Sequence, residues 1–252
     1  MEILLPDNIF ARILSSTLSD EDKNKLKHCP SSLLSKNVIE TKDSVTLIPT
    51  LDILSHKDLF VSRSIGISFD EPISNSYLHF NRGEKNIKEI VLSGDVSSNE
   101  AILTKILFSE TYGIDIQLGI EKPNGVSPSK NRILVGDRNF LEEDINLAIG
   151  FTEEIIELIS APYINFVFAS ESEDTLKEFH SKYLDIISVL NPLEVFENMN
   201  ANFPVASKNY LLENLQHVVF NFDEQDLEGV KQLLELPYYQ GIINDMIDVK
   251  FV

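Results

Sequence analysis

The chain of 252 residues is long enough to bury one large α/β core or two lobes of ordinary domain size. Its 40 Asp and Glu residues outnumber its 21 Lys and Arg residues, which gives a formal net charge of −19. This charge repels nucleic acid and anionic membrane surfaces, so neither is expected as a partner. The single cysteine, Cys29, excludes an intramolecular disulfide, and with five scattered histidines it does not form a typical zinc cluster.

The sequence contains no glycine-rich nucleotide loop and no HExxH pattern, so we expect no metal and no cofactor. The N-terminal stretch has no basic segment ahead of its apolar run, and residues 6–8 interrupt that run, so it does not resemble a secretory signal. No apolar run approaches the ~20 residues needed to cross a bilayer. We therefore expect a cytoplasmic protein.

The hydrophobic pattern predicts helices and strands that alternate along the first part of the chain. The expected elements are a strand at 2–5, a helix from 9 to 14, a helix from 30 to about 41, a buried strand at 45–48 and strands at 59–69 and 73–80. Residues 15–27 are polar and charged, and we expect them to form a surface excursion. The polar segment 81–86 is predicted to cross into a second lobe.

The stretch from Lys88 to Tyr112 predicts a buried strand, a tight turn at 93–95 and a helix. Ser97 or Ser98 is suited to cap this helix, with Glu100 in its first turn. A glycine turn followed by a serine-rich helix start presents backbone N–H groups and hydroxyls to an anion. This pattern predicts an anion-binding site at the helix start, although the serines could equally serve only as caps.

The remaining sequence continues the alternation of strands and helices. The expected elements are a strand at 114–120, a loop at 123–129, a strand at 132–135, a helix from 153, a strand at 165–169, helices at 172–190 and 209–215, a strand at 218–222 and a helix at 223–236. Such alternation is typical of an α/β fold with a largely parallel sheet.

Several fragments, in their order along the chain, resemble one enzyme family. They are LIPTLDIL (47–54), SNSYLHF (74–80), DVSSNEAILTKIL (95–107), ILVGD (133–137), INFVFA (164–169) and the C-terminal FNFDEQDLEGVKQLLELPYYQGII. Together they resemble the menaquinone-biosynthesis family of the futalosine pathway, which includes chorismate dehydratase. The resemblance implies a type II periplasmic-binding-protein-like fold with mixed, mainly parallel sheets, in which residues 1–83 and 168–252 form one lobe and residues 84–167 the other, with a ligand cleft between the lobes.

The resemblance also implies site residues. The family's serine on the strand before the hinge corresponds to Ser76, which becomes the candidate catalytic residue, although a shift of one residue onto Asn75 is possible. The candidate ligand-binding residues are Thr50 from the family's IPS-x-E pattern, Asn75, Ser97, Ser98 and Asn99 from the helix start, and Asp137 from the family's I-G-D pattern. The expected ligand is a small carboxylate; the sequence does not indicate an oligomeric state.

The helix start also departs from the family pattern. Where the family has Arg-Thr-Ser, this chain has Asn99-Glu100-Ala101, so a cation is replaced and an anion is added beside the expected carboxylate site. The family's N-terminal Tyr-Leu-Asn motif has no clear counterpart, because Asn8 lies in a different sequence. We therefore expect weaker binding of a dianion such as chorismate and a preference for a neutral or singly charged ligand.

Three functions remain open from the sequence. The first is a lyase of the chorismate dehydratase type, which the resemblance favours and which would position its substrate with Ser76, Ser97 and Ser98. The second is a catalytically inactive binding or regulatory protein of the same fold. The third is the solute-binding component of a transporter, which the N-terminal sequence argues against.

Overall fold

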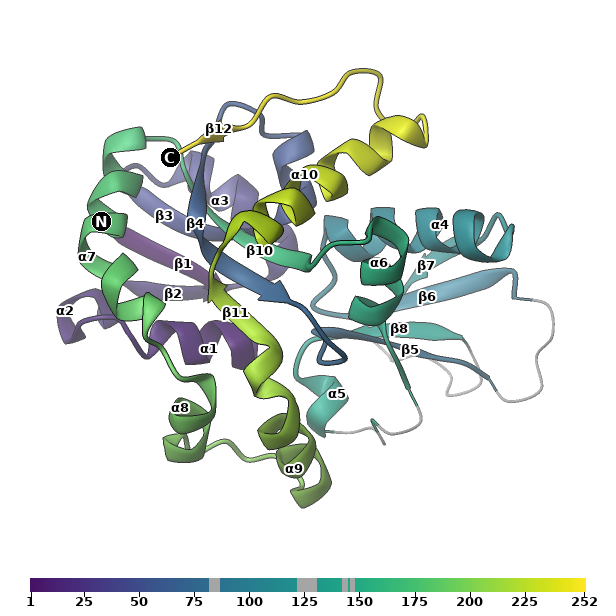
Figure 1. Cartoon of the computed structure of the whole chain (residues 1–252), viewed down its shortest axis with the longest axis horizontal. Coiled ribbons are helices and arrows are strands. Elements are labelled where there is room, and N and C mark those ends of the chain that lie inside the picture. The colour runs from purple at the N-terminus through teal and green to yellow at the C-terminus, as the bar shows by residue number, and fades with distance from the viewer. Residues whose placement is uncertain (82–86, 122–130, 142–144, 146–147) are drawn as a thin grey trace.

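The computed structural model describes residues 1–81, 87–121, 131–141, 145 and 148–252. In this part of the chain the strands form two separate sheets, one of seven strands and one of five. Each sheet is packed with helices, and the two assemblies lie side by side as two lobes (Figure 1). The expected two-lobed α/β organisation is therefore observed.

Lobe 1 is built on the seven-stranded sheet, whose strand order is β11-β4-β10-β3-β1-β2, with β12 paired to β4. Its strands are β1 (Glu2–Pro6), β2 (Leu26–Cys29), β3 (Ser44–Pro49), β4 (Phe60–Phe69), β10 (Tyr163–Ser170), β11 (Val218–Asn221) and β12 (Lys250–Phe251). Its helices are α1 (Ile9–Ser15), α2 (Asp20–Lys23), α3 (Leu34–Glu40), α7 (Glu173–Ser188), α8 (Pro192–Asn198), α9 (Val205–Asn214) and α10 (Glu224–Tyr239). Short 3₁₀ turns lie at η1 (Ser31–Leu33), η2 (Thr50–Leu54) and η4 (Leu215–His217).

Lobe 2 is built on the five-stranded sheet, whose strand order is β7-β6-β8-β5-β9. Its strands are β5 (Ser76–His79), β6 (Glu89–Gly94), β7 (Gln117–Ile120), β8 (Arg132–Val135) and β9 (Ile149–Gly150). Its helices are α4 (Ser98–Tyr112), α5 (Arg138–Leu141) and α6 (Phe151–Ile159).

The core of lobe 1 is centred on β3 and β10, which pair antiparallel and are buried along their whole length. Strands covered on both faces are apolar throughout rather than alternating, which is why the run NFVFA indicated a central strand. At one end of this pair Phe166 lies opposite Pro49, the residue at which β3 ends. Both sheets contain parallel and antiparallel pairs, and antiparallel pairs are as common as parallel ones among the described strands, so the sheets are mixed but not mainly parallel.

The boundaries between the two lobes, as defined by the two sheets, fall at other residues than those predicted from the sequence. Strand β5 pairs with β8 and β9 in lobe 2, although it lies before the predicted boundary at residue 83. Strand β10 belongs to lobe 1 from Tyr163 onward, five residues before the predicted return at 168. The crossings therefore fall between 69 and 76 and between 159 and 163. Alternation predicts a strand correctly but does not reveal its partner, because pairing depends on residues distant in sequence.

Most of the predicted strands and helices are present within a few residues of their expected bounds. Residues 15–27 are an exception, since they contain α2 and the start of the edge strand β2 in addition to surface turns. The predicted loop at 123–129 lies outside the described residues. Within the described part of the chain, no helix is both long and apolar enough to cross a membrane.

Candidate functional site

Two adjacent parallel strands of lobe 2, β6 and β8, end in the same motif, a left-handed glycine followed by an aspartate. Gly94 has φ +86° and Gly136 has φ +84°, a conformation that side chains disfavour. A Cβ on Gly94 would lie 2.1 Å from the carbonyl oxygen of Val135, so the strands can approach here only because this residue is glycine. The two turns direct Asp95 and Asp137 toward lobe 1.

Asp95 binds the start of η1 in lobe 1. Its Oδ1 accepts a hydrogen bond from the Ser31 backbone N–H (2.8 Å) and its Oδ2 accepts one from the Ser31 hydroxyl (2.6 Å). Burial raises the pKa of the Asp95 carboxyl above its ordinary value, although both Ser31 donors oppose the shift. The Asp95 carboxylate therefore accepts hydrogen bonds from two uncharged donors of lobe 1.

Asp137 binds the start of α1 in the same way. Its Oδ1 accepts a hydrogen bond from the Ile9 backbone N–H (2.8 Å), and its Oδ2 pairs with the Arg12 guanidinium. Burial raises the pKa of the Asp137 carboxyl more than the Arg12 charge lowers it. The sequence predicted Asp137 to bind a ligand; in the structure its carboxylate binds lobe 1.

The start of α4 carries Ser97 as its N-cap, as one of the two predicted alternatives. The Glu100 side chain completes a capping box: its Oε2 accepts hydrogen bonds from the Ser97 N–H (2.9 Å) and the Ser97 hydroxyl (2.7 Å). Its Oε1 accepts a hydrogen bond from the Ser76 hydroxyl (2.7 Å). The donors expected to hold a ligand carboxylate therefore already bind a carboxylate of the chain, and Glu100 is only 1% exposed.

Asn99 and Thr50 are fully buried and hold backbone groups. The Asn99 side chain accepts a hydrogen bond from the Leu51 N–H (2.9 Å) and donates one to the Asn165 carbonyl (2.7 Å), which connects α4 of lobe 2 to lobe 1. The Thr50 hydroxyl donates to the Ile164 carbonyl (2.7 Å) within lobe 1. Both side chains thus have structural partners at the positions where the resemblance implied ligand contacts.

Ser98 and Asn75 differ from the other candidates, because each has a buried polar atom without a partner among the described residues. These atoms are the Ser98 hydroxyl oxygen and the Asn75 side-chain oxygen. The Asn75 backbone carbonyl accepts a hydrogen bond from the Gly136 N–H (2.7 Å), which places this residue beside the second glycine–aspartate turn. Asn8, which caps α1, also has a buried side-chain nitrogen with no partner in the part of the chain that the structure describes.

A groove of about 810 Å³ opens where the α4 start faces η1. Lobe 1 contributes Pro30 and Ser32, and the described lining from lobe 2 is Leu92, Gly94, Asp95, Val96, Ser97, Ser98, Ala101, Ile120, Glu121 and Arg138. The Arg138 guanidinium in this lining donates a hydrogen bond to the Glu121 carboxylate (2.8 Å). The groove is therefore bounded by both lobes, and Ser98 is the predicted ligand-binding residue in its lining whose hydroxyl oxygen is buried without a partner among the described residues.

Asp95, Arg12 and Ser31 are functional candidates that were not predicted from the sequence. The available signal was the repetition of glycine–aspartate after two buried strands, at 94–95 and 136–137. Neither motif indicates its partner in lobe 1, since Ile9 and Asp137 are 128 positions apart. Among the described residues, no group of three His, Cys, Asp or Glu side chains is placed to hold a metal ion.

No protein-family model matches the chain, and no curated protein matches it. Solved structures do match over almost the whole length. Protein AF1704 of Archaeoglobus fulgidus superposes with a TM-score of 0.62 at 11% identity, covering 96% of this chain and 98% of that chain. The alkanesulfonate-binding protein SsuA of Xanthomonas axonopodis pv. citri, solved with bound MOPS, superposes with a TM-score of 0.61 at 12% identity, covering 100% and 97%.

A ligand-binding component of an ABC-type import system of Staphylococcus aureus, solved with zinc, also superposes with a TM-score of 0.61. It is 10% identical, and the match covers 100% of this chain and 95% of that chain. The chain has the two-lobe periplasmic-binding-protein fold. At these identities the likeness shows the fold alone, and the small molecules named with these structures belong to those proteins.

Proposed function

We propose that this chain is a small-molecule-binding protein whose ligand occupies the interlobe groove beside Ser98, and that Glu100 restricts the ligand to uncharged or singly charged molecules. The observation that carries the proposal is the position of the Glu100 carboxylate, which accepts hydrogen bonds from both Ser76 and Ser97. An incoming carboxylate would have to displace it from these donors and would also meet its negative charge.

The groove supports this assignment through its size and lining. A volume of about 810 Å³ lies within the range of small-molecule sites, and the wall combines apolar side chains with the Ser98 hydroxyl. The Ser98 hydroxyl oxygen is buried and has no partner among the described residues, so a ligand group would satisfy it once the Ser98 side chain turns toward the groove. In the lining the Glu121 carboxylate is paired with the Arg138 guanidinium (2.8 Å), and Asp95 adds one further negative charge, which disfavours a dianion.

The test is calorimetric titration of chorismate and of a panel of neutral and monoanionic compounds into the wild-type protein and the Glu100→Gln variant. We expect no chorismate binding by the wild type, and detectable binding once the glutamate charge is removed. Glu110→Gln is the matched control, because Glu110 is an exposed carboxylate on the same helix. Micromolar binding of chorismate by the wild type would contradict the proposal.

A second candidate is a cytoplasmic lyase of the chorismate dehydratase type acting in menaquinone biosynthesis. The ordered sequence fragments favour it, and the two-lobe fold is the one that the resemblance implies. The position of Ser76 argues against it, because the hydroxyl assigned to catalysis donates to Glu100 at 2.7 Å. Incubation of the purified protein with chorismate distinguishes the two candidates: formation of 3-enolpyruvylbenzoate would establish the enzyme and refute the non-catalytic assignment.

A further inference from the structure

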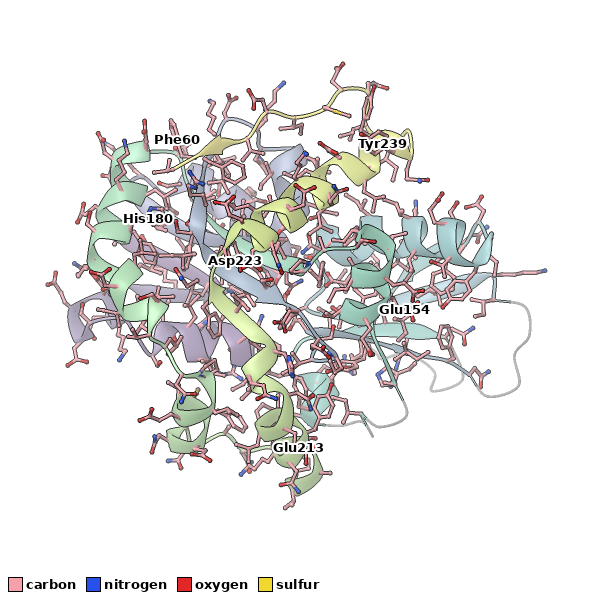
Figure 2. The ribbon with its side chains drawn as sticks, viewed as in Figure 1. Phe60, Glu154, His180, Glu213, Asp223 and Tyr239 are labelled. Carbon is pink, nitrogen blue, oxygen red and sulfur yellow. The ribbon has the colours of Figure 1, made fainter. Side chains whose placement is uncertain are left out.

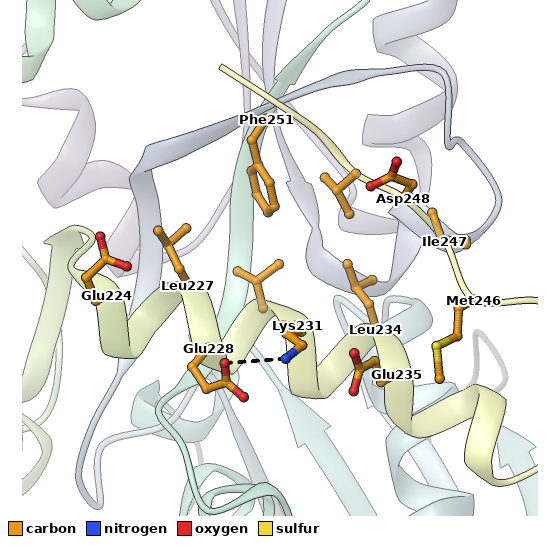
Figure 3. Close-up of a pocket in the computed structure, with 12 residues that line it drawn as sticks. Glu224, Leu227, Glu228, Lys231, Leu234, Glu235, Met246, Ile247, Asp248 and Phe251 are labelled. Atoms are coloured by element: carbon orange, nitrogen blue, oxygen red, sulfur yellow. Dashed lines mark ion pairs between the residues drawn. The ribbon is translucent and has the colours of Figure 1, made fainter.

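A second cavity lies on lobe 1, away from the interlobe groove. It is a slot of about 420 Å³ between α10 and the last residues of the chain (Figure 3). The segment 242–249, here called the C-terminal strap, runs above α10 and leads into β12 (Figure 1). The slot and the interlobe groove have no lining residue in common, so the two cavities can be tested independently.

The walls of the slot are apolar. Leu227, Val230 and Leu234 line it from one face of α10, at helical spacings of three and four residues. Val249 and Phe251 line it from the opposite side, and the Phe251 ring points toward the helix (Figure 3). Val230 is 1% exposed and Leu234 is 5% exposed, so the floor of the slot is continuous with the core of lobe 1.

The rim of the slot is acidic. Glu224, Glu228 and Glu235 extend from α10, and Asp248 extends from the strap (Figure 3). The lining has one cation, Lys231, whose ammonium lies 3.9 Å from the Glu228 carboxylate. Four carboxylates and one ammonium therefore line an apolar interior, in a protein whose net charge is −19. One of the four, Glu224, also lies 3.9 Å from the Arg63 guanidinium, which stands outside the lining.

The strap is held at its two ends. At its start, the Ile242 and Ile243 N–H groups donate to the Pro237 carbonyl (2.9 and 3.3 Å). At its end, β12 pairs with β4, and the Val252 N–H donates to the Val61 carbonyl (2.9 Å). The structure shows no hydrogen bond made by residues 244–248, all of which it describes. The slot beneath this strap, with a volume of about 420 Å³, has room for a small molecule.

We propose that this slot binds an organic cation with an apolar body, such as a hydrophobic amine or quaternary ammonium compound. The aliphatic walls bury the apolar body. The rim carboxylates attract the positive charge, and the face of Phe251 adds a cation–π contact. The volume of about 420 Å³ is in the lower part of the range for small-molecule sites.

The test uses benzyltrimethylammonium as the probe, with benzyl alcohol as a neutral comparison and phenylacetate as an anionic one. Titration of each into the ¹⁵N-labelled full chain is followed by amide resonances. We expect saturable shifts confined to α10, the strap and β12 with the ammonium probe only, and a weaker affinity at higher salt because the attraction is partly electrostatic.

Two variants locate the site. In Glu235→Gln/Asp248→Asn the slot keeps its shape and loses two negative charges, and we expect binding to weaken by about tenfold or more. In Leu227→Trp the larger side chain fills the slot, and we expect the shifts to disappear. The matched control is Glu197→Gln/Glu213→Gln, which removes two exposed carboxylates from α8 and α9; Glu213 lies far from α10's C-terminal Tyr239 (Figure 2).

Thermal unfolding of each variant verifies that the fold is retained. The proposal is overturned if benzyl alcohol or phenylacetate binds as tightly as the ammonium probe, if the shifts map to another surface, or if the control double variant weakens binding as much as the rim variant. Because the readout is local to the slot, none of these results depends on the ligand of the interlobe groove.

Discussion

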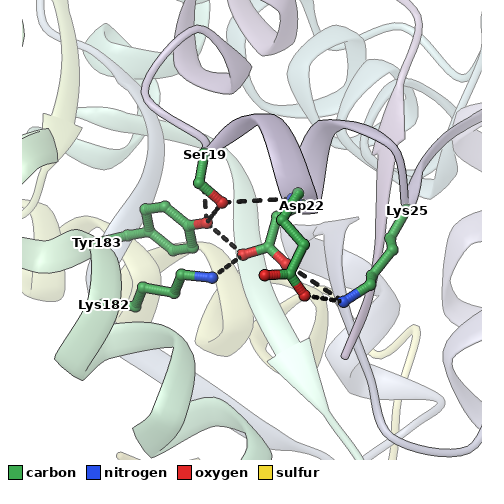
Figure 4. Close-up of polar contacts among 6 residues, drawn as sticks. Ser19, Asp22, Lys25, Lys182 and Tyr183 are labelled. Atoms are coloured by element: carbon green, nitrogen blue, oxygen red, sulfur yellow. Dashed lines mark hydrogen bonds and ion pairs between the residues drawn. The ribbon is translucent and has the colours of Figure 1, made fainter.

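Two aspartates, Asp95 and Asp22, make different kinds of contact in this molecule. Between the lobes, the Asp95 carboxylate is held by the neutral donors of Ser31. Within lobe 1, Asp22 on α2 binds the Lys182 ammonium and the Tyr183 hydroxyl of α7 (Figure 4). Asp22 is buried and Asp95 is half-buried, yet the pKa of Asp95 is raised and that of Asp22 is lowered.

The balance between burial and the charge of the partners explains this difference. Burial raises the pKa of both carboxyls, but at Asp22 the hydrogen bonds from Lys182 and Tyr183 outweigh it. At Asp95 the two donors from Ser31 carry no charge, and burial prevails. The two contacts also differ in what they join: the α2–α7 contact lies within lobe 1, whereas the Asp95 contact connects the two lobes. We expect the lobes to separate as a hinge, without unfolding, when such interlobe contacts are removed.

The largest effect is expected from Gly94→Ala, which alters the turn that presents Asp95. The new Cβ would lie 2.1 Å from the Val135 carbonyl oxygen, in a conformation with φ +86°. We expect a loss of about 3 kcal/mol or more in the free energy of unfolding, measured with urea. Gly113→Ala is the control, because it has φ +63° with nothing within 4 Å of the added Cβ, so only the conformational cost of about 1–2 kcal/mol should appear. Equal losses in the two variants would refute the steric argument.

Asp22→Asn is expected to lower the free energy of unfolding by about 2 kcal/mol, because two charge-assisted hydrogen bonds become weaker. The radius of gyration measured by small-angle X-ray scattering should not change, since the contact lies within lobe 1. Glu173→Gln removes an exposed partner of Lys177 on the same helix α7 and should leave stability unchanged. An expanded Asp22→Asn protein would show that the α2–α7 contact also controls the lobes.

Asn99→Ala removes the two hydrogen bonds from its side chain to Leu51 and Asn165. Because the exposed backbone groups can bind water once the lobes separate, we expect only about 1 kcal/mol of lost stability together with an increased radius of gyration. Thr104→Ala is a matched buried change on the same helix and should not alter the scattering. If Asn99→Ala unfolds the protein without first expanding it, the lobes do not open as a hinge.

The smallest expected effect is on the pH dependence of stability, and Asp22 and Asp95 should change the free energy of unfolding with pH in opposite directions. Because the pKa of Asp22 is lowered in the folded protein, its contribution to stability is present above the ordinary carboxyl pKa of about 3.9 and is lost as pH falls through the folded value. Because the pKa of Asp95 is raised, its contribution is present below the ordinary value and is lost as pH rises through the folded value.

Urea unfolding of wild type, Asp22→Asn and Asp95→Asn between about pH 3 and pH 7 measures this difference. The stability gap between wild type and Asp22→Asn should widen as pH rises. The corresponding gap for Asp95→Asn should change in the opposite direction, and parallel pH profiles for the two variants would contradict the partner-based explanation.

Local sequence features predicted the secondary structure and part of the site. The turn at 93–95, the Ser97 cap and the α4 helix are each specified by neighbouring residues, so the pattern was sufficient. The occupation of the expected anion site by Glu100 could not be predicted in the same way. Glu100 was placed correctly in the first turn of the helix, but its hydrogen bond from Ser76 joins residues 24 positions apart. The hydrophobic periodicity of the sequence does not predict such a long-range contact.

The sequence by itself therefore determined the alternating strands and helices and the turn at 93–95, because these depend on side-chain periodicity and on residues adjacent in the chain. The two lobes were implied by the resemblance of its ordered fragments to a known family. Only the tertiary structure decided which sheet includes β5 and which groups of lobe 1 donate hydrogen bonds to Asp95 and Asp137. It also decided that the Ser76 and Ser97 hydroxyls donate to the Glu100 carboxylate. These outcomes join segments far apart in sequence, and packing brings their donors and acceptors within hydrogen-bonding distance.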